Sequence, residues 1–407
     1  MLDIKYIKEN PQIVKDAIKA KGREVDIDKL LELDIKRREL IVKLDELRHQ
    51  QKAYTKDQIK EGGKIKEEIK KIAIQEKEIF EEYQKLLSQV PNPPLDFVPI
   101  GTEQDNKIIK TQGSPNKFDF KIKDHIELGK TLDIIDFERS SAMSGARFYT
   151  LKGKGALLEL SLMRYVIDVL IKKGFTFILP PHILNSFSMK GMGYLDHNGD
   201  QEIYYLSKDS LYLIGTSEQA LGSFYQNSIF DEKELPLRLC AFSPCYRREA
   251  GSYGKDTRGM FRVHQFNKVE MFSYVLPHNS QKEHRDLVAI EEEIVSSLGI
   301  PYQLILIASG DLGDPAAAKY DIEAWFPGQN KYREITSCSN VTDYQARRLN
   351  IRYKTNQDKS EHVHMLNGTG VSSRMLIAIL ENYQQKDGSI LIPNVLTQYT
   401  GFDKISP

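Results

Sequence analysis

The sequence has little that would suit an oxidising compartment or a structural metal site. It contains only three cysteines among 407 residues, Cys240, Cys245 and Cys338, and no two of them form a Cys-x-x-Cys pair. An odd number of cysteines without metal-ligand spacing argues against a disulfide framework and predicts no structural zinc. We therefore expect a reducing compartment, in which the three cysteines are small buried apolar residues.

Long apolar runs are also missing. No stretch of the sequence approaches the roughly 20 apolar residues that a helix needs to span a bilayer. The first ten residues lack both the apolar core of a signal peptide and the acid-poor composition of a transit peptide. These absences predict a cytoplasmic protein with no membrane contact.

Neither sign of charge is in excess, and several motifs of common enzymes are absent. Lys plus Arg and Asp plus Glu each number 57, so any affinity for nucleic acid must come from local patches. There is no Gly-x-x-x-x-Gly-Lys-Ser/Thr phosphate loop, no His-Glu-x-x-His and no Gly-x-Ser-x-Gly, and Gly368-Thr-Gly370 lacks the third glycine of a dinucleotide fingerprint. Nucleophilic serine or cysteine catalysis therefore has no support, while the length predicts two or three domains.

The most informative stretch that is present spans residues 240–272. Two β-like runs, Leu239–Tyr246 and Met260–Phe272, flank a glycine-rich loop, and this arrangement predicts a β-hairpin with a long tip. The cations of this hairpin are Arg247, Arg248, Lys255, Arg258 and Arg262, and its lone carboxylates are Glu249 and Glu270. Guanidinium groups pair bidentately with phosphate oxygens, so the cluster predicts a polyphosphate site. The alternative is a charged surface hairpin without a ligand.

This stretch closely resembles a known motif. Tyr246-Arg-Arg-Glu-Ala-Gly-Ser252, then Arg258-Gly259, then Phe261-Arg-Val-His-Gln-Phe266 and Lys268-Val-Glu270 are similar to motif 2 of class II aminoacyl-tRNA synthetases, in the form found in seryl-tRNA synthetases. Glu334-Ile-Thr-Ser-Cys-Ser-Asn340 resembles the same family, and His364–Arg374 resembles its motif 3. A helix over 157–173, a strand over 175–179 and Pro180-Pro181 resemble motif 1, which builds the dimer interface in that class.

A coiled coil is predicted before these motifs. Residues that are mostly apolar recur at alternating steps of four and three over residues 33–54 and again over residues 65–86, with Gly62-Gly63 between the two series. This spacing predicts two antiparallel helices joined by a glycine turn. Four prolines between Pro91 and Pro99 then predict a stiff linker. We accordingly expect an N-terminal domain at residues 1–100 and a second domain at residues 101–407.

Charge is distributed unevenly along the predicted hairpin. The candidate tRNA-binding residues near its tip are Arg48, Lys52, Lys56, Lys60, Lys64, Lys66, Lys70 and Lys71. Lysines of this kind can hold a phosphate backbone in a sequence-independent, salt-sensitive way. Self-association of the coiled coil, with charges that only solvate its outer face, is the alternative. Seryl-tRNA synthetases carry a similar arm that grips the long variable arm of the serine tRNA, and the resemblance favours that function.

The resemblance implies an α+β fold, an antiparallel β-sheet flanked by helices that follows the coiled-coil arm. It also implies an ATP site, with Mg²⁺ bound through Glu334 and Ser337. The implied ATP-binding residues are Arg247, Arg248, Glu249, Arg262, Val263, Phe266, Glu334, Ile335, Thr336, Ser337 and Arg374, of which Arg247, Glu334 and Arg374 are the implied catalytic residues. An arginine in the first turn of a helix, as expected at Arg374, is locally unfavourable unless it shares an anion with the helix terminus. Glu334 has an alternative interpretation as an exposed glutamate on a strand edge.

The implied serine pocket completes the set. Its residues are Thr216, Ser217, Glu218, Arg247, Glu270, Asn367 and Thr369. Thr216-Ser-Glu-Gln219 is also typical of a helix capping box, which needs no ligand, and the two interpretations are compatible.

Together these features imply ATP-dependent attachment of serine to tRNA(Ser) through seryl-adenylate, by a homodimer that also serylates tRNA(Sec) where that tRNA is present. Two other classes remain open: a related ligase that charges a carrier protein, and a non-catalytic RNA-binding relative.

Overall fold

The computed structural model describes residues 1–407 except residues 54–58, 198, 251–257 and 356–357. The chain divides into two compact units, Met1–Pro93 and Pro94–Pro407, and the boundary lies within the proline-rich segment.

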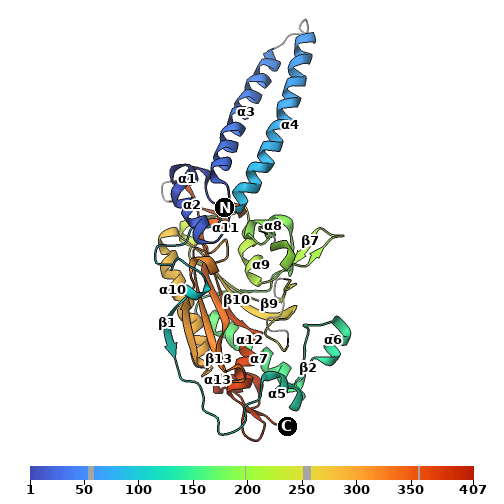
Figure 1. The fold of residues 1–407 in the computed structure, drawn as a ribbon, viewed down its shortest axis with the longest axis vertical. Helices are drawn as coiled ribbons and strands as arrows, with labels where there is room; N and C mark the ends of the chain where they lie inside the picture. The colour runs from blue at the N-terminus through green and yellow to red at the C-terminus, as the bar shows by residue number, and fades with distance from the viewer. Residues whose placement is uncertain (54–58, 198, 251–257, 356–357) are drawn as a thin grey trace. The chain divides into compact units, whose positions relative to one another are not determined.

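The first unit is helical. Its helices are α1 (Ile4–Glu9), α2 (Pro11–Ala20), α3 (Ile27–Ala53) and α4 (Ile59–Gln89). Figure 1 shows α3 and α4 as the two long helices of a hairpin, and they pack along their length. Leu44 and Leu47 of α3 are buried against Ile72 of α4, with Leu40, Ile65, Ile69 and Ala73 beside them. The antiparallel coiled-coil arm is therefore confirmed.

One seam position of the arm is occupied by a cation. The guanidinium carbon of Arg37 lies 5.1 Å from the ring centroid of Tyr83 and 5.6 Å from that of Phe80. An arginine over an aromatic face keeps its charge while its stem covers apolar surface. This contact explains how Arg37 occupies a heptad position that usually holds an apolar residue.

The predicted glycine turn is wrong. Gly62 and Gly63 lie inside α4, which already begins at Ile59. A glycine inside a helix costs only about 1 kcal/mol relative to alanine, and the apolar series over residues 65–86 continues directly from it. Packing of α4 along α3 outweighs this small penalty, so the two glycines do not end the helix.

The second unit is built on an eight-stranded sheet of order β1-β11-β12-β13-β16-β10-β9-β4. Neighbouring strands are antiparallel throughout except for β4 and β9, which are parallel. The strands are β1 (Lys107–Gln112), β4 (Thr176–Ile178), β9 (Leu237–Tyr246), β10 (Gln265–Val275), β11 (Tyr302–Leu306), β12 (Ala318–Phe326), β13 (Lys331–Asn340) and β16 (His364–Ser372). The predicted α+β class is confirmed.

Three helices form the main apolar layer against this sheet. They are α7 (Gly153–Lys172), α10 (Ser280–Ser297) and α12 (Ser373–Asn382), which Figure 1 shows beside the strands. Buried residues such as Leu162, Leu287 and Leu376 join Val269 and Met271 of β10 in one cluster. Since side chains alternate along a strand, Lys268 and Glu270 of β10 point to the opposite face, where the candidate site lies.

Smaller elements complete the unit. The remaining helices are α5 (His125–Thr131), α6 (Glu138–Ser144), α8 (Ser186–Met192), α9 (Ser217–Ser223), α11 (Tyr344–Leu349) and α13 (Asn394–Thr400). The remaining strands are β2 (Ile135–Asp136), β3 (Thr150–Leu151), β5 (Ile183–Asn185), β6 (Tyr205–Leu206), β7 (Leu211–Leu213), β8 (Ile229–Asp231), β14 (Arg352–Lys354), β15 (Ser360–His362), β17 (Ile390–Leu391) and β18 (Lys404–Ile405). Short 3-10 turns link several of these elements.

The central hairpin exists, with one correction. β9 pairs with β10 from Tyr246↔Gln265 to Leu237↔Tyr274. The second strand is predicted to begin at Met260, but it begins at Gln265, and the Met260 amide instead donates to His125, the first residue of α5. Buried Met260, Phe261 and Val263 explain the apolar character that suggested a strand.

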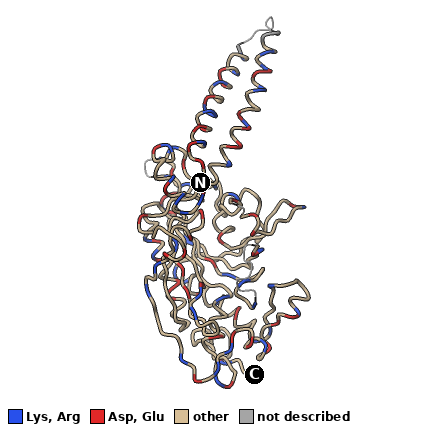
Figure 2. Tube along the Cα trace, in the orientation of Figure 1, with Lys and Arg blue, Asp and Glu red and all other residues tan. Residues whose placement is uncertain are grey.

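Charged residues of both signs are spread over the chain (Figure 2). On the arm, Lys43 of α3 pairs with Glu68 of α4 at 3.2 Å. Within the described part of the chain, no helix combines the length and the apolar character that crossing a bilayer requires.

Candidate active site

A pocket lies on the face of the sheet to which Lys268 points. Its walls come from the end of β9, the segment after the hairpin tip, β10, β13, β16 and the start of α12. The lining residues are Arg247, Glu249, Met260, Phe261, Val263, Phe266, Lys268, Glu334, Ile335, Ser337, Thr369, Ser372, Ser373 and Arg374. The fold thus brings together three distant segments that the sequence had marked.

Arg247 follows directly after β9 and is held from several sides. Its Nε donates to the carbonyl oxygen of Gly215 at 3.0 Å, and its guanidinium carbon lies 5.2 Å from the ring centroid of Phe266. Its backbone N–H donates to the carbonyl oxygen of His264 at 3.0 Å. A guanidinium fixed in this way is preorganised for an anion and loses little side-chain entropy on binding one.

Arg262 and Glu249 form an ion pair. Arg262 Nη1 lies 3.0 Å from Glu249 Oε2, and both side chains are partly exposed. Glu249 lines the pocket and has a positive φ of 51°. Neither Arg262 nor the exposed Arg248 is among the lining residues.

Arg374 and Glu334 form the opposite wall. Arg374 is the second residue of α12, and its Nη1 lies 3.2 Å from Glu334 Oε1 and donates to the carbonyl oxygen of Glu334 at 3.1 Å. Desolvation acts to raise the pKa of Glu334, but the positive charges of Arg374, Lys319 and Arg247 outweigh it and lower the pKa. The side chain is 50% exposed, which limits the desolvation, so Glu334 stays ionised at the mouth of the pocket.

A second carboxyl group lies near Glu334. Burial raises the pKa of Asp321 to about 7, Lys319 at 3.5 Å opposes this shift, and the charge of Glu334 adds to it. Asp321 of β12 is the cross-strand partner of Ser337 of β13. Asp321 was not a candidate from the sequence, because its burial and its pairing with Ser337 become visible only in the folded chain.

The residues present fit a magnesium ion that enters with a nucleotide. Mg²⁺ is usually held by one or two protein oxygens together with waters and phosphate oxygens. Glu334 supplies an ionised carboxylate and Ser337 a hydroxyl group along the same wall. Among the described residues, no group of three or more His, Cys, Asp or Glu side chains could hold a metal by itself, so the phosphates would have to complete the ligand set.

A buried polar network adjoins this wall. Thr216 Oγ1 donates to Glu270 Oε2 at 3.2 Å, and Lys268 Nζ pairs with Glu270 Oε2 and donates to Thr216 Oγ1 at 3.2 Å. Burial raises the pKa of Glu270 to about 7, with Lys268 opposing the shift and the charge of Glu218 adding to it. Lys268 was missed as a candidate, although its position two residues before Glu270 on a strand puts both on one face.

Glu218 is positioned by the start of α9. Thr216 is the N-cap of this helix, and its hydroxyl accepts from the backbone N–H of Glu218 at 3.3 Å. The carboxyl group of Glu218 accepts from Tyr194 Oη at 2.6 Å and from Gln345 Nε2 at 3.0 Å. The capping and the ligand interpretations of this segment are thus compatible. Tyr194 and Gln345 had no signal in the sequence, because their neighbours carry no recognisable motif.

The other predicted residues fall into two groups. Thr369 is the cross-strand partner of Glu270, and Asn367 is that of Phe272, so both lie on β16 beside the network. By contrast, the hydroxyl of Ser217 bonds that of Ser243 at 2.6 Å, and Thr336 Oγ1 donates to Glu291 Oε2 of α10 at 2.9 Å. Neither Ser217 nor Thr336 lines the pocket.

The predicted tRNA-binding residues lie on the arm. Arg48, Lys52, Lys64, Lys66, Lys70 and Lys71 are exposed on α3 and α4. Lys60 belongs to α4, and Lys56 lies outside the described residues. Arg48 Nη1 donates to Asp45 Oδ1 at 3.4 Å.

Two family models match the chain. Residues 1–94 match the seryl-tRNA synthetase N-terminal domain, and residues 204–383 match the class II tRNA synthetase core domain for G, H, P, S and T. A serine–tRNA ligase of Dictyoglomus thermophilum is 45% identical over all of both chains, and one of Nitrosopumilus maritimus is 43% identical over 99% of this chain and 100% of its own.

Solved structures give the same result. The seryl-tRNA synthetase of Pyrococcus horikoshii, crystallised with ATP, superposes with a TM-score of 0.91 at 38% identity and covers 100% of both chains. The cytoplasmic serine-tRNA ligase of Naegleria fowleri with AMP gives 0.88 at 36% identity, over 100% of this chain and 99% of its own.

Proposed function

The chain belongs to the seryl-tRNA synthetase family and is an enzyme of the serine–tRNA ligase type, and from this premise we propose that it charges tRNA(Ser) in two steps through an enzyme-bound seryl-adenylate. In the first step, a carboxylate oxygen of serine attacks the α-phosphorus of ATP. A new P–O bond forms, the bond to the bridging oxygen of the β-phosphate breaks, and pyrophosphate leaves. In the second step, a hydroxyl of the terminal ribose of tRNA attacks the seryl carbonyl carbon, and AMP leaves.

No side chain has to act as a nucleophile in this scheme. The residues bind and orient the two substrates and neutralise the charge that develops on the transferring phosphorus. Arg247 is assigned to the α-phosphate and the serine carboxylate, and Phe266, which packs against Arg247, to the adenine ring. Arg374 and Arg262 are assigned to the γ-phosphate end. Arg262 must then exchange its contact with Glu249 for a phosphate oxygen, leaving Glu249 beside the adenine.

Glu334 and Ser337 would hold Mg²⁺ that arrives with ATP. When bound, the ion neutralises phosphate charge and orients the leaving pyrophosphate. The salt bridge between Glu334 and Arg374 keeps the carboxylate ionised before the nucleotide binds.

The network of Thr216, Lys268 and Glu270 is assigned to serine. Glu218 and Glu270 suit its ammonium group, and Asn367 and Thr369 its hydroxyl. A pocket that hydrogen-bonds a substrate hydroxyl rejects the analogue without it by up to about 10⁴–10⁵-fold, because its own polar groups would stay unpaired. Alanine is therefore expected to be a poor substrate.

Residues 1–100 are assigned to tRNA binding, with exposed lysines of α3 and α4 contacting the phosphate backbone, and residues 101–407 to catalysis. We extend the proposal to a cytoplasmic homodimer and to serylation of tRNA(Sec) where that tRNA is present. The observation that supports the whole scheme most is the meeting of Arg247, Glu334 and Arg374 along one pocket beside a buried carboxyl network.

The test is amino-acid-dependent ATP–pyrophosphate exchange with a panel of amino acids. Serine should drive exchange, and alanine, threonine and cysteine should do so at least about 10²-fold less well. Exchange driven best by another amino acid would overturn the serine assignment, and no exchange at all would favour a non-catalytic relative.

A second assay distinguishes a ligase that charges tRNA from the related ligase that charges a carrier protein. Transfer of serine to tRNA(Ser) transcript is expected, whereas transfer only to a carrier protein would identify the other ligase class. The match of residues 1–94 to the family's N-terminal domain favours tRNA.

A further inference from the structure

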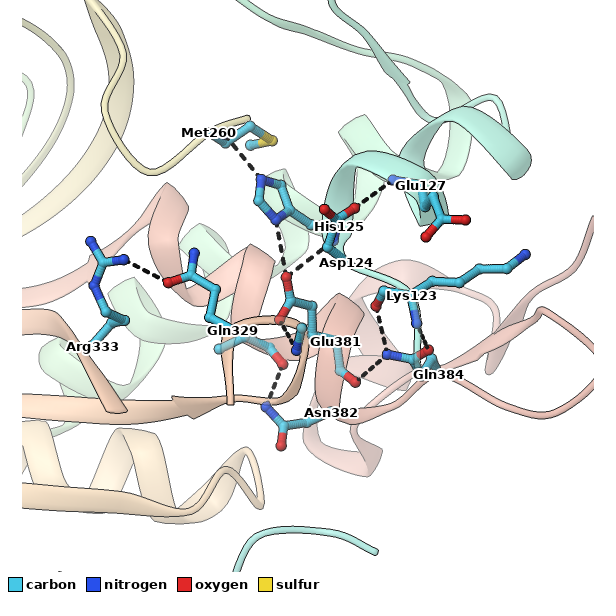
Figure 3. Close-up of polar contacts among 12 residues, drawn as sticks. Lys123, Asp124, His125, Glu127, Met260, Gln329, Arg333, Glu381, Asn382 and Gln384 are labelled. Atoms are coloured by element: carbon cyan, nitrogen blue, oxygen red, sulfur yellow. Dashed lines mark hydrogen bonds and ion pairs between the residues drawn. The ribbon is translucent and has the colours of Figure 1, made fainter. Parts of the chain in front are cut away.

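A buried polar cluster lies behind the wall of the pocket and belongs to none of the assigned roles. It joins His125, the first residue of α5, to Glu381 of α12 and to the backbone of Met260 (Figure 3). His125 is 3% exposed, Met260 1% and Glu381 0%. Polar groups buried this completely are costly unless each one is hydrogen-bonded.

The bonds of this cluster fix the state of the imidazole ring. The backbone N–H of Met260 donates to Nε2 of His125 at 3.1 Å, so Nε2 must carry a lone pair. Nδ1 lies 3.0 Å from Glu381 Oε1 and must then carry the proton of a neutral ring. Glu381 only accepts, from His125 Nδ1, from the backbone N–H of His125 at 3.0 Å and from that of Gly328 at 2.9 Å.

This arrangement is unsuited to acid–base catalysis. A His–Glu pair that activates a nucleophile presents its second ring nitrogen to that nucleophile. Here a main-chain amide occupies the second nitrogen, and the ring edge packs on Phe261 with centroids 5.4 Å apart. The imidazole therefore serves as a fixed acceptor for the backbone of the segment that follows the hairpin tip.

That segment carries contacts of the pocket. The carbonyl oxygen of Phe261, the residue after Met260, accepts from Arg374 Nε at 3.4 Å. The ring of Phe261 lies under Arg333, whose guanidinium carbon is 4.7 Å from its centroid, and Arg333 in turn donates to Gln329 at 2.6 Å. Met260, Phe261 and Val263 all line the pocket, so the position of the Met260 amide sets the position of its wall.

The backbone at Gly259 lies very close to the imidazole ring of His125. Gly259 has a φ of 76°, and a Cβ at that position would come within 2.2 Å of His125 Nε2. Glycine is the residue that adopts this backbone conformation at little cost and leaves room for the ring. The position of the His125 ring therefore requires a glycine at position 259.

We propose that His125 is a positioning residue for nucleotide binding: its neutral ring, oriented by Glu381, holds the Met260 amide and thereby the wall formed by Phe261 and Arg374. This inference rests on the proposed assignment of ATP to the pocket. It predicts that the acceptor at the Nε2 position, rather than the ring itself, determines affinity for ATP.

Two substitutions of His125 test the roles of its two ring nitrogens separately. In His125→Asn, the side-chain amide can still donate to Glu381 from the position of Nδ1 but cannot reach Met260. In His125→Gln, the longer side chain can place an oxygen at the position of Nε2 and accept from the Met260 amide. We expect His125→Asn to raise KM for ATP in serine-dependent exchange by roughly tenfold, since a buried amide loses its acceptor, with kcat and KM for serine within about twofold of wild type. His125→Gln should stay within about threefold for all three parameters.

His278→Asn is the control for the substitution itself, because His278 is exposed in the 3-10 turn Pro277–Asn279 and lies outside the pocket; it should leave KM for ATP unchanged. An unchanged KM for ATP in His125→Asn, or equal effects of both His125 substitutions, would overturn the proposal.

If His125→Asn is too unstable for the exchange assay, the Kd for ATP tests the proposal instead. It is measured by equilibrium dialysis on the same variants and on Gly259→Ala. Gly259→Ala, which moves the amide away from the ring, should also weaken ATP binding; an unchanged Kd would contradict the proposal. If the wild-type chain binds ATP but shows no serine-dependent exchange, the proposed function fails, whereas the Kd comparison still judges His125.

Discussion

At the scale of single residues, Arg247 is the best-anchored cation of the pocket. Its Nε bond to Gly215 and its packing on Phe266 leave it in one orientation. We expect Arg247→Ala to lower serine-dependent exchange by at least about 10²-fold, because a preorganised charge at a reacting phosphoryl group contributes on that order. Arg247→Lys should recover little, since an ammonium group lacks the planar fork.

The melting temperature of both variants should stay near that of wild type. Arg285→Ala, an exposed arginine of α10, is the control for loss of one positive charge. Exchange within about twofold of wild type in Arg247→Ala would remove Arg247 from the site.

Glu270 makes the site sensitive to pH. Burial raises its pKa to about 7, so below pH 7 the side chain is mostly neutral and a poor partner for an ammonium group. We expect KM for serine to fall by about tenfold between pH 6 and pH 8 as Glu270 ionises. Steady-state exchange across this range measures it, and Glu270→Gln should give a flat profile at a high KM. A wild-type profile without a step near pH 7 would contradict the assignment.

The same shift affects stability with a defined sign. The folded-state pKa of Glu270 lies above the ordinary value, so the folded state binds the extra proton. The contribution of Glu270 to the free energy of unfolding is therefore fully present below the ordinary carboxyl range and is lost as the pH rises to about 7.

Site residues that lie within a recognisable sequence motif could be predicted from the sequence. Arg247, Glu334 and Arg374 carry motif signatures, and the structure brings them to one pocket. Tyr194 and Gln345 could not be predicted, because their role depends on where Glu218 lies in the folded chain. Ser217 and Thr336 show the converse, since alternation along an element turns a residue beside a site residue away from the site.

At the scale of elements, periodicity predicted the long helices well and their ends poorly. The apolar seam of α3 and α4 was visible in the spacing, whereas the position of the turn depended on Gly62 and Gly63, whose helical penalty is smaller than the packing energy around them. The start of β10 was missed for a related reason. Burial of Met260, Phe261 and Val263 produces the same apolar pattern as a strand.

The arm offers an element-scale test of tRNA binding. Lys70 and Lys71 are exposed on α4 in its first half, and Lys77 and Lys85 are exposed further along the same helix. We expect the double variant Lys70→Ala/Lys71→Ala to raise KM for tRNA severalfold and to reduce the salt dependence of charging, because phosphate contacts release counterions. Lys77→Ala/Lys85→Ala is the matched control and should behave like wild type.

Serine-dependent exchange should be unchanged in both double variants. Equal changes in KM for tRNA would show that the basic residues near the tip have no special role.

At the scale of the whole molecule, the two compact units suggest a separable enzyme. Leu95 donates its backbone N–H to Ala317 at 2.9 Å, and Val98 is buried with Ile305, so the second unit begins at Pro94. We expect a chain of residues 94–407 to fold, to retain serine-dependent exchange within about threefold, and to lose charging of tRNA(Ser).

Circular dichroism and both assays on the truncated and full chains measure this. A matched truncation after residue 100, which removes Leu95 and Val98 from their packing, should be less stable. Parallel loss of exchange and charging in residues 94–407 would show that the first unit is not a dedicated tRNA-binding device.

The three cysteines have a practical consequence for the folded molecule. Cys240, Cys245 and Cys338 sit within β9 and β13 with no exposed surface, and burial raises the pKa of each thiol. A maleimide dye added to the native enzyme should therefore find no reactive sulfur until the central strands separate. The rate of dye incorporation therefore measures the rate at which the sheet opens. Fraying of the helical arm does not affect this rate, because the arm has no cysteine.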